Sequence, residues 1–242
     1  MQKKLIKWLK NKVKESGSKG IICGLSGGID SAVAAVLAKR AFPKNSLFLF
    51  LPCNSNPHDR KHAFMLKRKF NLNLKEIDIE PVYNAFLKIL KVKKASKLPK
   101  LLLANLKPRI RMIMLYFYAN KFNYLVAGTG NRSELTVGYF TKYGDGGVDI
   151  LPLGNLLKRE VRKLAEDLNI PDEIIEKPPS AGLWENQTDE KEIGITYEEL
   201  DCIIEALGRK RTPRVSGKKV EKVKRMNKSS AHKMKMPEIF TF

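Results

Sequence analysis

The sequence predicts an α/β fold in which helices flank a doubly wound parallel β-sheet, and three observations point to it. Short apolar runs alternate with segments of helical periodicity, which is the pattern of strand–helix–strand units. The continuous apolar run Ser46–Leu51 is typical of a strand buried on both faces of a parallel sheet. The loop Gly24–Ser31 is rich in glycine and serine and lies between an apolar run and an Ala/Val/Leu-rich run, so a strand leads into it and a helix leads out.

The first half of the chain alternates regularly between helix and strand. The apolar residues at 5, 6, 9 and 13 share one helical face, and Gly17–Gly20 ends that helix. Pro81 favours the start of a later helix because its fixed φ suits the first turn. We therefore expect helices over 3–15, 30–41, 58–70 and from 81, and strands over 21–25, 46–51 and 73–79.

The second half of the chain is less regular. A basic loop at 93–100 precedes a long helix over 101–119, which Pro108 kinks or restarts. A fourth strand is expected over 124–127, and the glycine-rich stretch 128–157 is expected to be a functional loop region. Further helices are expected over 158–168 and 196–207. We expect one domain over 1–242, in which the charged segment 208–236 is mobile until a ligand binds.

The composition narrows the classes of function. The formal net charge of +21 fits a nucleic-acid partner, an anionic substrate or a Lys-rich proteome. Basic residues gather in 91–111 and 209–235, and charge runs of this kind are usually solvated faces. No apolar run reaches the roughly 18 residues of a membrane span, and the charged N-terminus does not resemble a signal peptide. Three scattered cysteines form no zinc or disulfide pattern and favour a reducing cytoplasm.

The loop Gly24–Ser31 has the properties of a polyphosphate-binding loop. Its two adjacent glycines allow positive φ and the close approach of a bulky anion. The hydroxyl groups of Ser26 and Ser31 and the N–H groups of the helix start face one place, where the helix dipole favours negative charge. Asp30 would repel a phosphate unless a cation lay between them, so we expect Mg²⁺ on Asp30. No lysine follows the glycines, so this is not a Walker loop, and a plain glycine turn is the structural alternative.

A second concentration of polar residues follows the fourth expected strand. The block Gly138–Asp149 holds a lysine, two carboxylates, aromatic residues and several glycines within a dozen positions. Core packing does not explain such a composition, although a surface hairpin with turn glycines is the simpler alternative. The block is therefore a second candidate binding site.

Taken in order, these motifs resemble one family closely, the ammonia-dependent NAD synthetases, over nearly the whole chain. The Ser-Gly-Gly-x-Asp-Ser pattern at 26–31 is similar to the loop of the ATP pyrophosphatases. The other matching blocks are Gly128–Glu134, Phe140–Asp145, Leu151–Leu153 with Lys158, Lys177–Trp184, Gln187–Glu190, and His232-Lys233 with Pro237. The resemblance implies the adenine nucleotide alpha hydrolase-like fold of the ATP pyrophosphatases.

The resemblance also implies a reaction. In the family, the nicotinate carboxylate of deamido-NAD attacks the α-phosphate of ATP and pyrophosphate leaves. Ammonia then attacks the adenylate, which gives NAD and AMP in the last step of NAD biosynthesis. Cations must neutralise the carboxylate and the polyphosphate as they approach, and ammonium must lose a proton within a closed site.

The resemblance assigns site residues position by position. For ATP it implies Gly24, Leu25, Ser26, Gly27, Gly28, Ile29, Asp30, Ser31, Thr129, Lys158 and Ser180, where the family more often has Thr at the last position. For Mg²⁺ it implies Asp30 and Glu134, and for deamido-NAD it implies Arg109, Lys142, Asp149, His232 and Lys233. Asp145 is a candidate for handling ammonium, and the expected catalytic residues are Asp30, Glu134, Lys158 and Asp145.

Other functions and partners stay open from sequence alone. A tRNA-modifying ATP pyrophosphatase would suit the positive charge, but the Gly138–Asp149 block and the absence of Cys-x-x-Cys pairs disfavour it. A non-catalytic nucleotide sensor is disfavoured by the pair Asp30 and Glu134. Because the synthetase motifs span the sequence, we expect no glutaminase domain and ammonia as the nitrogen donor, with a glutaminase in trans as the alternative. Similarity to the family also favours a homodimer without a membrane partner.

Overall fold

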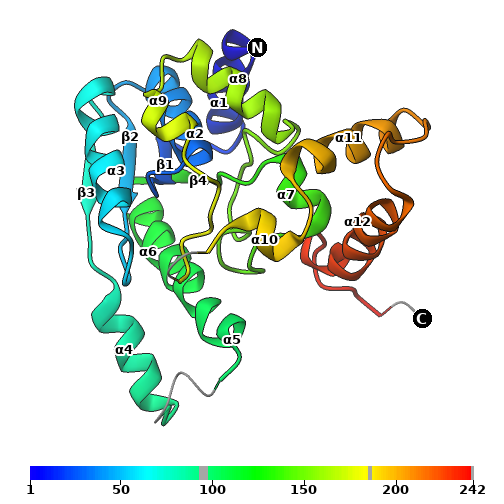
Figure 1. The fold of residues 1–242 in the computed structure, drawn as a ribbon. Helices are drawn as coiled ribbons and strands as arrows, with labels where there is room; N and C mark the ends of the chain where they lie inside the picture. The colour runs from blue at the N-terminus through cyan, green and yellow to red at the C-terminus, as the bar shows by residue number, and fades with distance from the viewer. Residues whose placement is uncertain (93–97, 185–186, 241–242) are drawn as a thin grey trace.

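A parallel four-stranded sheet lies at the centre of the computed structural model, which describes residues 1–92, 98–184 and 187–240 (Figure 1). The strand order is β3-β2-β1-β4. The strands are β1 (Gly20–Gly24), β2 (Ser46–Phe50), β3 (Leu74–Glu76) and β4 (Tyr124–Ala127). The chain winds from β1 outward to β3 and then returns to place β4 on the other side of β1. The doubly wound parallel sheet predicted from the sequence is confirmed.

Helices cover both faces of the sheet. One core packs the sheet against α1 (Gln2–Glu15), α2 (Ile29–Ala41), α3 (Pro57–Phe70), α8 (Lys158–Asp167) and α9 (Asp172–Ile175). The opposite core packs it against α4 (Glu80–Ile89) and α6 (Leu106–Phe122), and α5 (Lys100–Ala104) precedes α6. Successive residues of β1 face opposite cores, since Ile21 and Cys23 belong to the first and Ile22 to the second.

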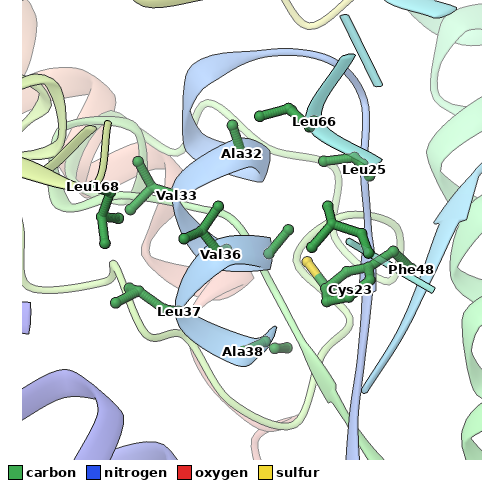
Figure 2. Close-up of a cluster of buried hydrophobic side chains, with 14 of the residues drawn as sticks. Cys23, Leu25, Ala32, Val33, Val36, Leu37, Ala38, Phe48, Leu66 and Leu168 are labelled. Atoms are coloured by element: carbon green, nitrogen blue, oxygen red, sulfur yellow. The ribbon is translucent and has the colours of Figure 1, made fainter. Parts of the chain in front are cut away.

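Helix α2 is almost entirely buried, which fixes the position of the loop before it. Its residues Ala32, Val33, Val36 and Leu37 are each at most 1% exposed, and they lie among side chains of the sheet and neighbouring helices (Figure 2). Helix α2 also contacts both α1 and α8. A helix held on all sides keeps its N-terminus at one place relative to the sheet.

A third, smaller core holds the C-terminal helices together, and these helices lie to one side of the sheet (Figure 1). It is formed by buried residues of α7 (Arg132–Val137), α10 (Asp189–Ile193), α11 (Tyr197–Gly208) and α12 (Gly217–Ser230). The short 3-10 helix η2 (Ala231–Lys233) follows α12. None of the helices within the described ranges is both long and apolar enough to cross a membrane.

Several boundaries differ from those predicted. The expected helix 101–119 is divided at Asn105 into α5 and α6, and Pro108 lies in the first turn of α6, where its missing N–H costs little. The third strand is shorter than expected. The expected loop 128–157 contains the short helix α7, and the expected basic loop 93–100 lies largely outside the described residues.

The segment 208–236, which we expect to be mobile until a ligand binds, contains a helix that packs in the third core. It forms α12, whose residues Val220 and Val223 are 9% and 1% exposed in the third core. Val220 and Val223 lie three residues apart on one helical face, but the many charged residues around them made this apolar pattern weak in the sequence. Some of the basic residues of this segment, among them Lys218, Lys222 and Arg225, therefore lie on a packed helix.

The topology places the candidate site at one edge of the sheet. Cys23 of β1 pairs with Ala127 of β4, so the two strands end side by side. The direction of winding reverses between these strands, and ligands in open α/β sheets bind outside such a switch point. The loops after β1 and β4 carry the two motifs singled out from the sequence.

Candidate active site

The loop after β1 is tied to the first turn of α2 by its serines. Ser31 Oγ donates to the Gly28 carbonyl (2.8 Å), accepts from the Ser26 N–H (3.1 Å) and lies 3.0 Å from Ser26 Oγ. Gly27 has a φ of +80°, and a Cβ there would lie 2.4 Å from the Asp59 carbonyl oxygen, so no larger residue fits. Gly28 is the N-cap of α2 and has no side chain, so it leaves the helix N-terminus open to an anion.

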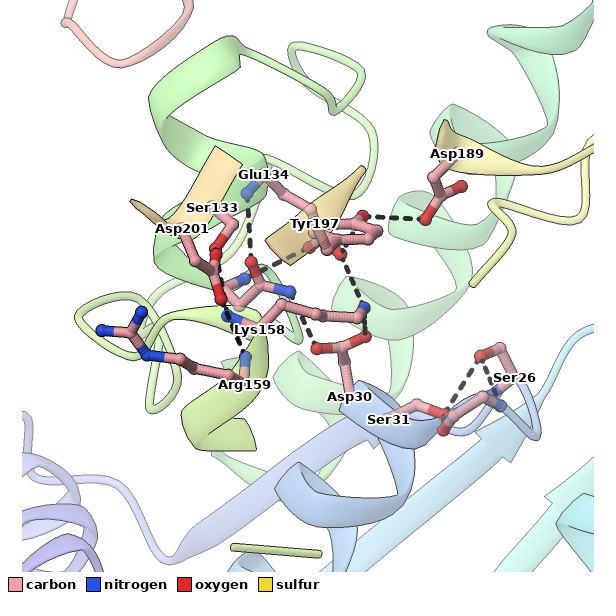
Figure 3. Close-up of polar contacts among 12 residues, drawn as sticks. Ser26, Asp30, Ser31, Ser133, Glu134, Lys158, Arg159, Asp189, Tyr197 and Asp201 are labelled. Carbon is pink, nitrogen blue, oxygen red and sulfur yellow. Dashed lines mark hydrogen bonds and ion pairs between the residues drawn. The ribbon is translucent and has the colours of Figure 1, made fainter. Parts of the chain in front are cut away.

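Asp30 and Glu134 hold one buried ammonium group between them (Figure 3). Asp30 lies in the first turn of α2, after β1, and Glu134 lies in the first turn of α7, after β4. Lys158 Nζ, from the start of α8, lies 2.5 Å from Asp30 Oδ2 and 3.2 Å from Glu134 Oε1. The Lys158 side chain is 2% exposed. The carboxylates therefore neutralise a cation that is almost entirely removed from water, although a helix N-terminus disfavours a lysine.

Asn131 connects the two carboxylates. Its Nδ2 donates to Asp30 Oδ1 (2.9 Å), and its N–H donates to Glu134 Oε2 (3.2 Å). Its Oδ1 accepts from the Glu134 N–H (3.0 Å), which completes a capping box at the start of α7. One residue therefore fixes both acids and leaves one oxygen of each toward Lys158.

Tyr197 and Asp189 close the cluster on the side of α10 and α11. The Tyr197 hydroxyl lies 3.2 Å from Glu134 Oε1 and 2.9 Å from Asp189 Oδ2. The Tyr197 ring lies beside Lys158, with 4.7 Å between Nζ and the ring centroid. Asp189 is 4% exposed, and its Oδ1 has no hydrogen-bond partner among the described residues.

The protonation of the cluster follows from burial and from neighbouring charges. Burial raises the pKa of Glu134, and the Lys158 ammonium opposes this shift. Burial by itself would lower the pKa of Lys158, but Asp30 and Glu134 outweigh it and hold that pKa above its ordinary value. Burial also raises the pKa of Asp189, against the effect of Lys158. Lys158 is therefore charged at neutral pH.

Asp201 of α11 supports the site through its contacts with Ser133 and Arg159 (Figure 3). It is 1% exposed, accepts from the Ser133 hydroxyl, and accepts from the Arg159 N–H at 2.9 Å. The Lys158 N–H in turn donates to Ser133 Oγ (3.0 Å). These bonds satisfy the first N–H groups of α8 and put a carboxylate at the positive end of that helix. These bonds fix the backbone positions from which the side chains of Glu134 and Lys158 extend.

A second polar group joins the loop 138–149 to the C-terminal segment. Lys142 Nζ donates to the His232 carbonyl (2.8 Å), and Lys233 Nζ donates to two carbonyl groups of the loop (2.8 and 2.9 Å). Arg109 Nε of α6 donates to the Lys142 carbonyl at 3.4 Å. Four of the five residues expected to bind deamido-NAD therefore lie in one group.

The remaining expected residues have other neighbours. Asp149 accepts from the Val126 N–H (2.7 Å) and from the Tyr116 hydroxyl (2.9 Å), which ties the loop to β4. Asp145 Oδ1 accepts from the Thr141 N–H (2.9 Å) within its own turn. These two acids shape the loop 138–149 without contacting the Lys158 cluster in any hydrogen bond among the described residues.

Four further positions expected to bind ATP differ in what they can offer. Leu25 and Ile29 are 1% and 5% exposed, so only their backbone is available to a ligand. Thr129 follows β4 and is half-buried. Ser180 is exposed, and its Oγ accepts from the Gly182 N–H (3.1 Å).

Sequence reasoning missed the roles of Asn131, Tyr197 and Asp201. Asn131 had a local signal, since Asn-x-x-Glu before an apolar stretch is a capping-box pattern. Tyr197 and Asp201 had no local signal, because both lie on α11, far along the chain from their partners. Tyr197 is 63 residues from Glu134, and Asp201 is 68 residues from Ser133. Only the packing of the third core brings them to the site.

Comparison with known proteins gives a consistent result. The family model described as NAD synthase matches residues 1–237. The NH(3)-dependent NAD(+) synthetase of Carboxydothermus hydrogenoformans is 49% identical over 236 residues, which are 98% of this chain and 95% of that protein. Among solved structures, the NMN synthetase from Francisella tularensis has a TM-score of 0.91 at 40% identity, over 100% of this chain and 97% of that one.

A third relative has the same fold. The NH3-dependent NAD synthetase from Campylobacter jejuni, solved in complex with the nitrate ion, has a TM-score of 0.82 at 34% identity. The match covers 99% of this chain and 97% of that one. Taken together, the motifs, the fold and these matches show that the chain belongs to the NAD synthase family, a family of ligases that form a carbon–nitrogen bond.

Proposed function

We propose that the protein amidates the nicotinate carboxylate of deamido-NAD with ammonia, and that ATP activates this carboxylate. The products would be NAD, AMP and pyrophosphate, as the last step of NAD biosynthesis. The observation that carries the proposal is the pair Asp30 and Glu134 around a buried cation, beside a glycine–serine loop at the ends of β1 and β4. The names of the relatives support ammonia as the nitrogen donor.

The residues around Lys158 fit a magnesium ion. Two carboxylates already gather around one cation, and carboxylate oxygens are the ligands that Mg²⁺ prefers. The described residues contain no cluster of three or more His, Cys, Asp or Glu side chains that could hold a metal. This matches Mg²⁺, which is usually held by one or two carboxylates together with phosphates and water. Bound there, the ion would neutralise phosphate charge.

Each part of the loop after β1 then has a task in binding ATP. The N–H groups at the start of α2 and the glycine backbone receive phosphate oxygens. The hydroxyl groups of Ser26 and Ser31 lie 3.0 Å apart beside the same place, and that of Ser31 would exchange its bond to the Gly28 carbonyl for a phosphate oxygen. Lys158, which is charged and lies beside Asp30, supplies a positive charge to the triphosphate.

The reaction would run in two displacements. A carboxylate oxygen of nicotinate attacks the α-phosphorus, and the bond to pyrophosphate breaks, which leaves an acyl adenylate. The nitrogen of ammonia then attacks the carbonyl carbon, AMP leaves, and the nitrogen loses a proton. We assign Asp145 a part in taking the proton from ammonium, because its position in the loop matches the acid that the family has near the nicotinate end.

The second polar group is the proposed site for the pyridine dinucleotide. Arg109, Lys142 and Lys233 would place cations around the pyrophosphate of deamido-NAD, His232 would lie beside them, and Asp149 would hold the loop. The amino groups of Lys142 and Lys233 donate to carbonyl groups of the loop and of the C-terminal segment. Both can exchange these neutral acceptors for phosphate oxygens, which are stronger acceptors.

We also propose that the protein acts as a homodimer in the cytoplasm. Large apolar side chains are exposed on α4, α5 and α6 and beside them: Val82, Phe86, Ile89, Leu90, Leu101, Leu102, Ile113, Phe117 and Phe122. An exposed apolar surface of this kind marks an interaction site in a globular protein. A second copy of the chain, which carries the same surface, is a suitable partner.

A test of the function measures NAD formation by the purified protein with ATP, Mg²⁺ and deamido-NAD. We expect turnover with ammonium and none with glutamine alone, and loss of turnover in Asp30→Ala. Turnover sustained by glutamine alone would contradict the proposed donor. Turnover of Asp30→Ala at the wild-type rate would contradict the proposed site.

One observation favours a second candidate substrate. The solved relative with a TM-score of 0.91 is described as an NMN synthetase, so nicotinate mononucleotide is the alternative acceptor of ammonia. The two substrates share the reacting carboxylate and differ in the adenylate half. The same assay, run with each substrate separately, decides between them by the ratio of the two kcat/KM values.

A further inference from the structure

The amino group of Lys158 occupies the same two oxygens that a divalent cation would need. It contacts Asp30 Oδ2 at 2.5 Å and Glu134 Oε1 at 3.2 Å. The other oxygens of these acids are engaged by Asn131, which donates from Nδ2 to Asp30 and from its N–H to Glu134. The two acids therefore turn one oxygen each toward the same place, which Lys158 Nζ occupies.

A divalent cation and the ammonium group cannot share this place. Magnesium binds carboxylate oxygens at about 2.0–2.1 Å, so an ion that bridges Asp30 and Glu134 would lie where Nζ lies. The Lys158 side chain is 2% exposed, and water cannot screen the repulsion between two cations there. Entry of the metal therefore requires the ammonium group to leave.

We propose that Lys158 is an internal stand-in for the divalent cation, and that its ammonium group competes with the metal for Asp30 and Glu134. The inference rests on the proposed function, because it takes these two acids as the metal ligands. On metal binding, the lysine moves from the carboxylates toward the triphosphate of ATP.

The surroundings of Lys158 allow this movement. The Tyr197 ring, 4.7 Å from Nζ, can continue to face the cation after it leaves the carboxylates. Asp189 is buried nearby, and its Oδ1 has no hydrogen-bond partner within the described ranges. The ammonium group therefore has neighbours besides Asp30 and Glu134.

The competition has a consequence for ligand binding. A metal that binds without ATP must displace the Lys158 ammonium group from Asp30 and Glu134. The displaced ammonium group then has no anion as close to it as these two carboxylates were. A metal that arrives with ATP brings phosphate oxygens that receive the lysine. Metal and nucleotide should therefore favour each other's binding, and each should bind more weakly alone.

The test titrates the purified protein with Mn²⁺ alone and measures free Mn²⁺ by electron paramagnetic resonance. Lys158→Met removes the charge and keeps most of the side-chain length. We expect it to bind Mn²⁺ at least tenfold more tightly than the wild type, although it has lost a residue of the site. Lys163→Met, at an exposed position of the same helix, removes the same charge and should bind Mn²⁺ as the wild type does.

A second readout is thermal unfolding with and without MnCl2. Lys158→Met leaves two buried carboxylates facing each other, so its midpoint should be lower than that of the wild type and should rise with Mn²⁺. The wild-type midpoint should change much less. Should Lys158→Met not fold, Lys158→Gln, which keeps an amide donor between the acids, is measured in the same way.

The outcomes distinguish the inference from the proposed function. Equal or weaker Mn²⁺ binding by Lys158→Met overturns the inference, while the ammonium-dependent formation of NAD by the wild type leaves the proposed function standing. Asp30→Asn in the Lys158→Met background should abolish the tight Mn²⁺ binding. Tight binding that survives this change places the metal elsewhere and overturns the inference together with the metal site.

Discussion

At the scale of single residues, the candidate site depends on side chains that satisfy two demands at once. Asn131 caps α7 and holds Asp30, and Lys158 begins α8 and neutralises two acids. The chemistry of the two motif loops could be predicted, because Asp30 and Glu134 follow expected strands and stand in family-like patterns. The contact of Lys158 with Asp30 could not be derived from spacing, since 128 residues separate them.

Gly27 offers a test of the loop geometry. Gly27→Ala should lower the free energy of unfolding by clearly more than the control Gly17→Ala. Both glycines have positive φ, which costs an alanine about 1–2 kcal/mol. Only at Gly27 would the new Cβ meet a backbone carbonyl, at 2.4 Å, whereas it meets nothing within 4 Å at Gly17. Urea denaturation measures both, and equal losses would show that the loop is not held against α3 as described.

Asn131 offers a test of the link between the two acids. Asn131→Ala removes a helix cap and should cost about 1 kcal/mol of stability. Asn131→Ser keeps a capping oxygen and adds no charge but loses the Nδ2 donor to Asp30, so it should lose less stability than Asn131→Ala. Both variants should lose roughly tenfold or more in the rate of NAD formation, as is usual when the support of metal ligands is removed. An Asn131→Ser protein with wild-type activity would contradict the role given to the amide.

At the scale of elements, the strands and the long helices could be predicted because their hydrophobic periods are strong. The apolar residues of β2 and the buried face of α8 are visible in the sequence. Two other helices, one short and one highly charged, could not be predicted in this way. Helix α7 has six residues inside a glycine-rich stretch, and α12 hides two buried valines among basic residues. Tertiary packing, which no local pattern reports, decides both.

Asp201 tests how the C-terminal helices support the site. Asp201→Ala leaves the Ser133 hydroxyl and the Arg159 N–H without their acceptor in a buried place, so stability should fall by about 2–3 kcal/mol. The matched control is Glu205→Ala, which removes a carboxylate of the same helix whose ion pair with Arg159 is partly exposed. The control should cost much less stability than Asp201→Ala, because ion pairs exposed to water contribute little. Chemical denaturation decides, and equal costs would mean that Asp201 is not a buried support.

At the scale of the whole molecule, three cores and one sheet edge place the two polar groups. The predicted class of fold and the family are confirmed, because they rest on many motifs in a fixed order. The sequence alone did not decide between several explanations of the high net charge. In the structure, part of it lies on α12 and in the second polar group, where Lys142 and Lys233 are held by carbonyl groups.

The exposed apolar residues give a prediction about assembly. Phe117 of α6 is 59% exposed, and Phe117→Glu should convert a dimer into a monomer because it puts a charge on the proposed interface. Leu207→Glu makes the same kind of change at an exposed position of α11 and should leave the dimer intact. Light scattering after size-exclusion chromatography measures the mass. A monomeric wild type would contradict the proposed homodimer.

The proposed reaction requires that ATP, held beside Asp30 and Glu134, accept a carboxylate oxygen of the pyridine nucleotide on its α-phosphorus. The most direct measurement uses deamido-NAD with ¹⁸O in the nicotinate carboxylate and mass spectrometry of the products. The proposed reaction predicts one ¹⁸O atom in AMP and none in pyrophosphate. Label in inorganic phosphate, with ADP as the other product, would show attack on the γ-phosphorus and contradict the account.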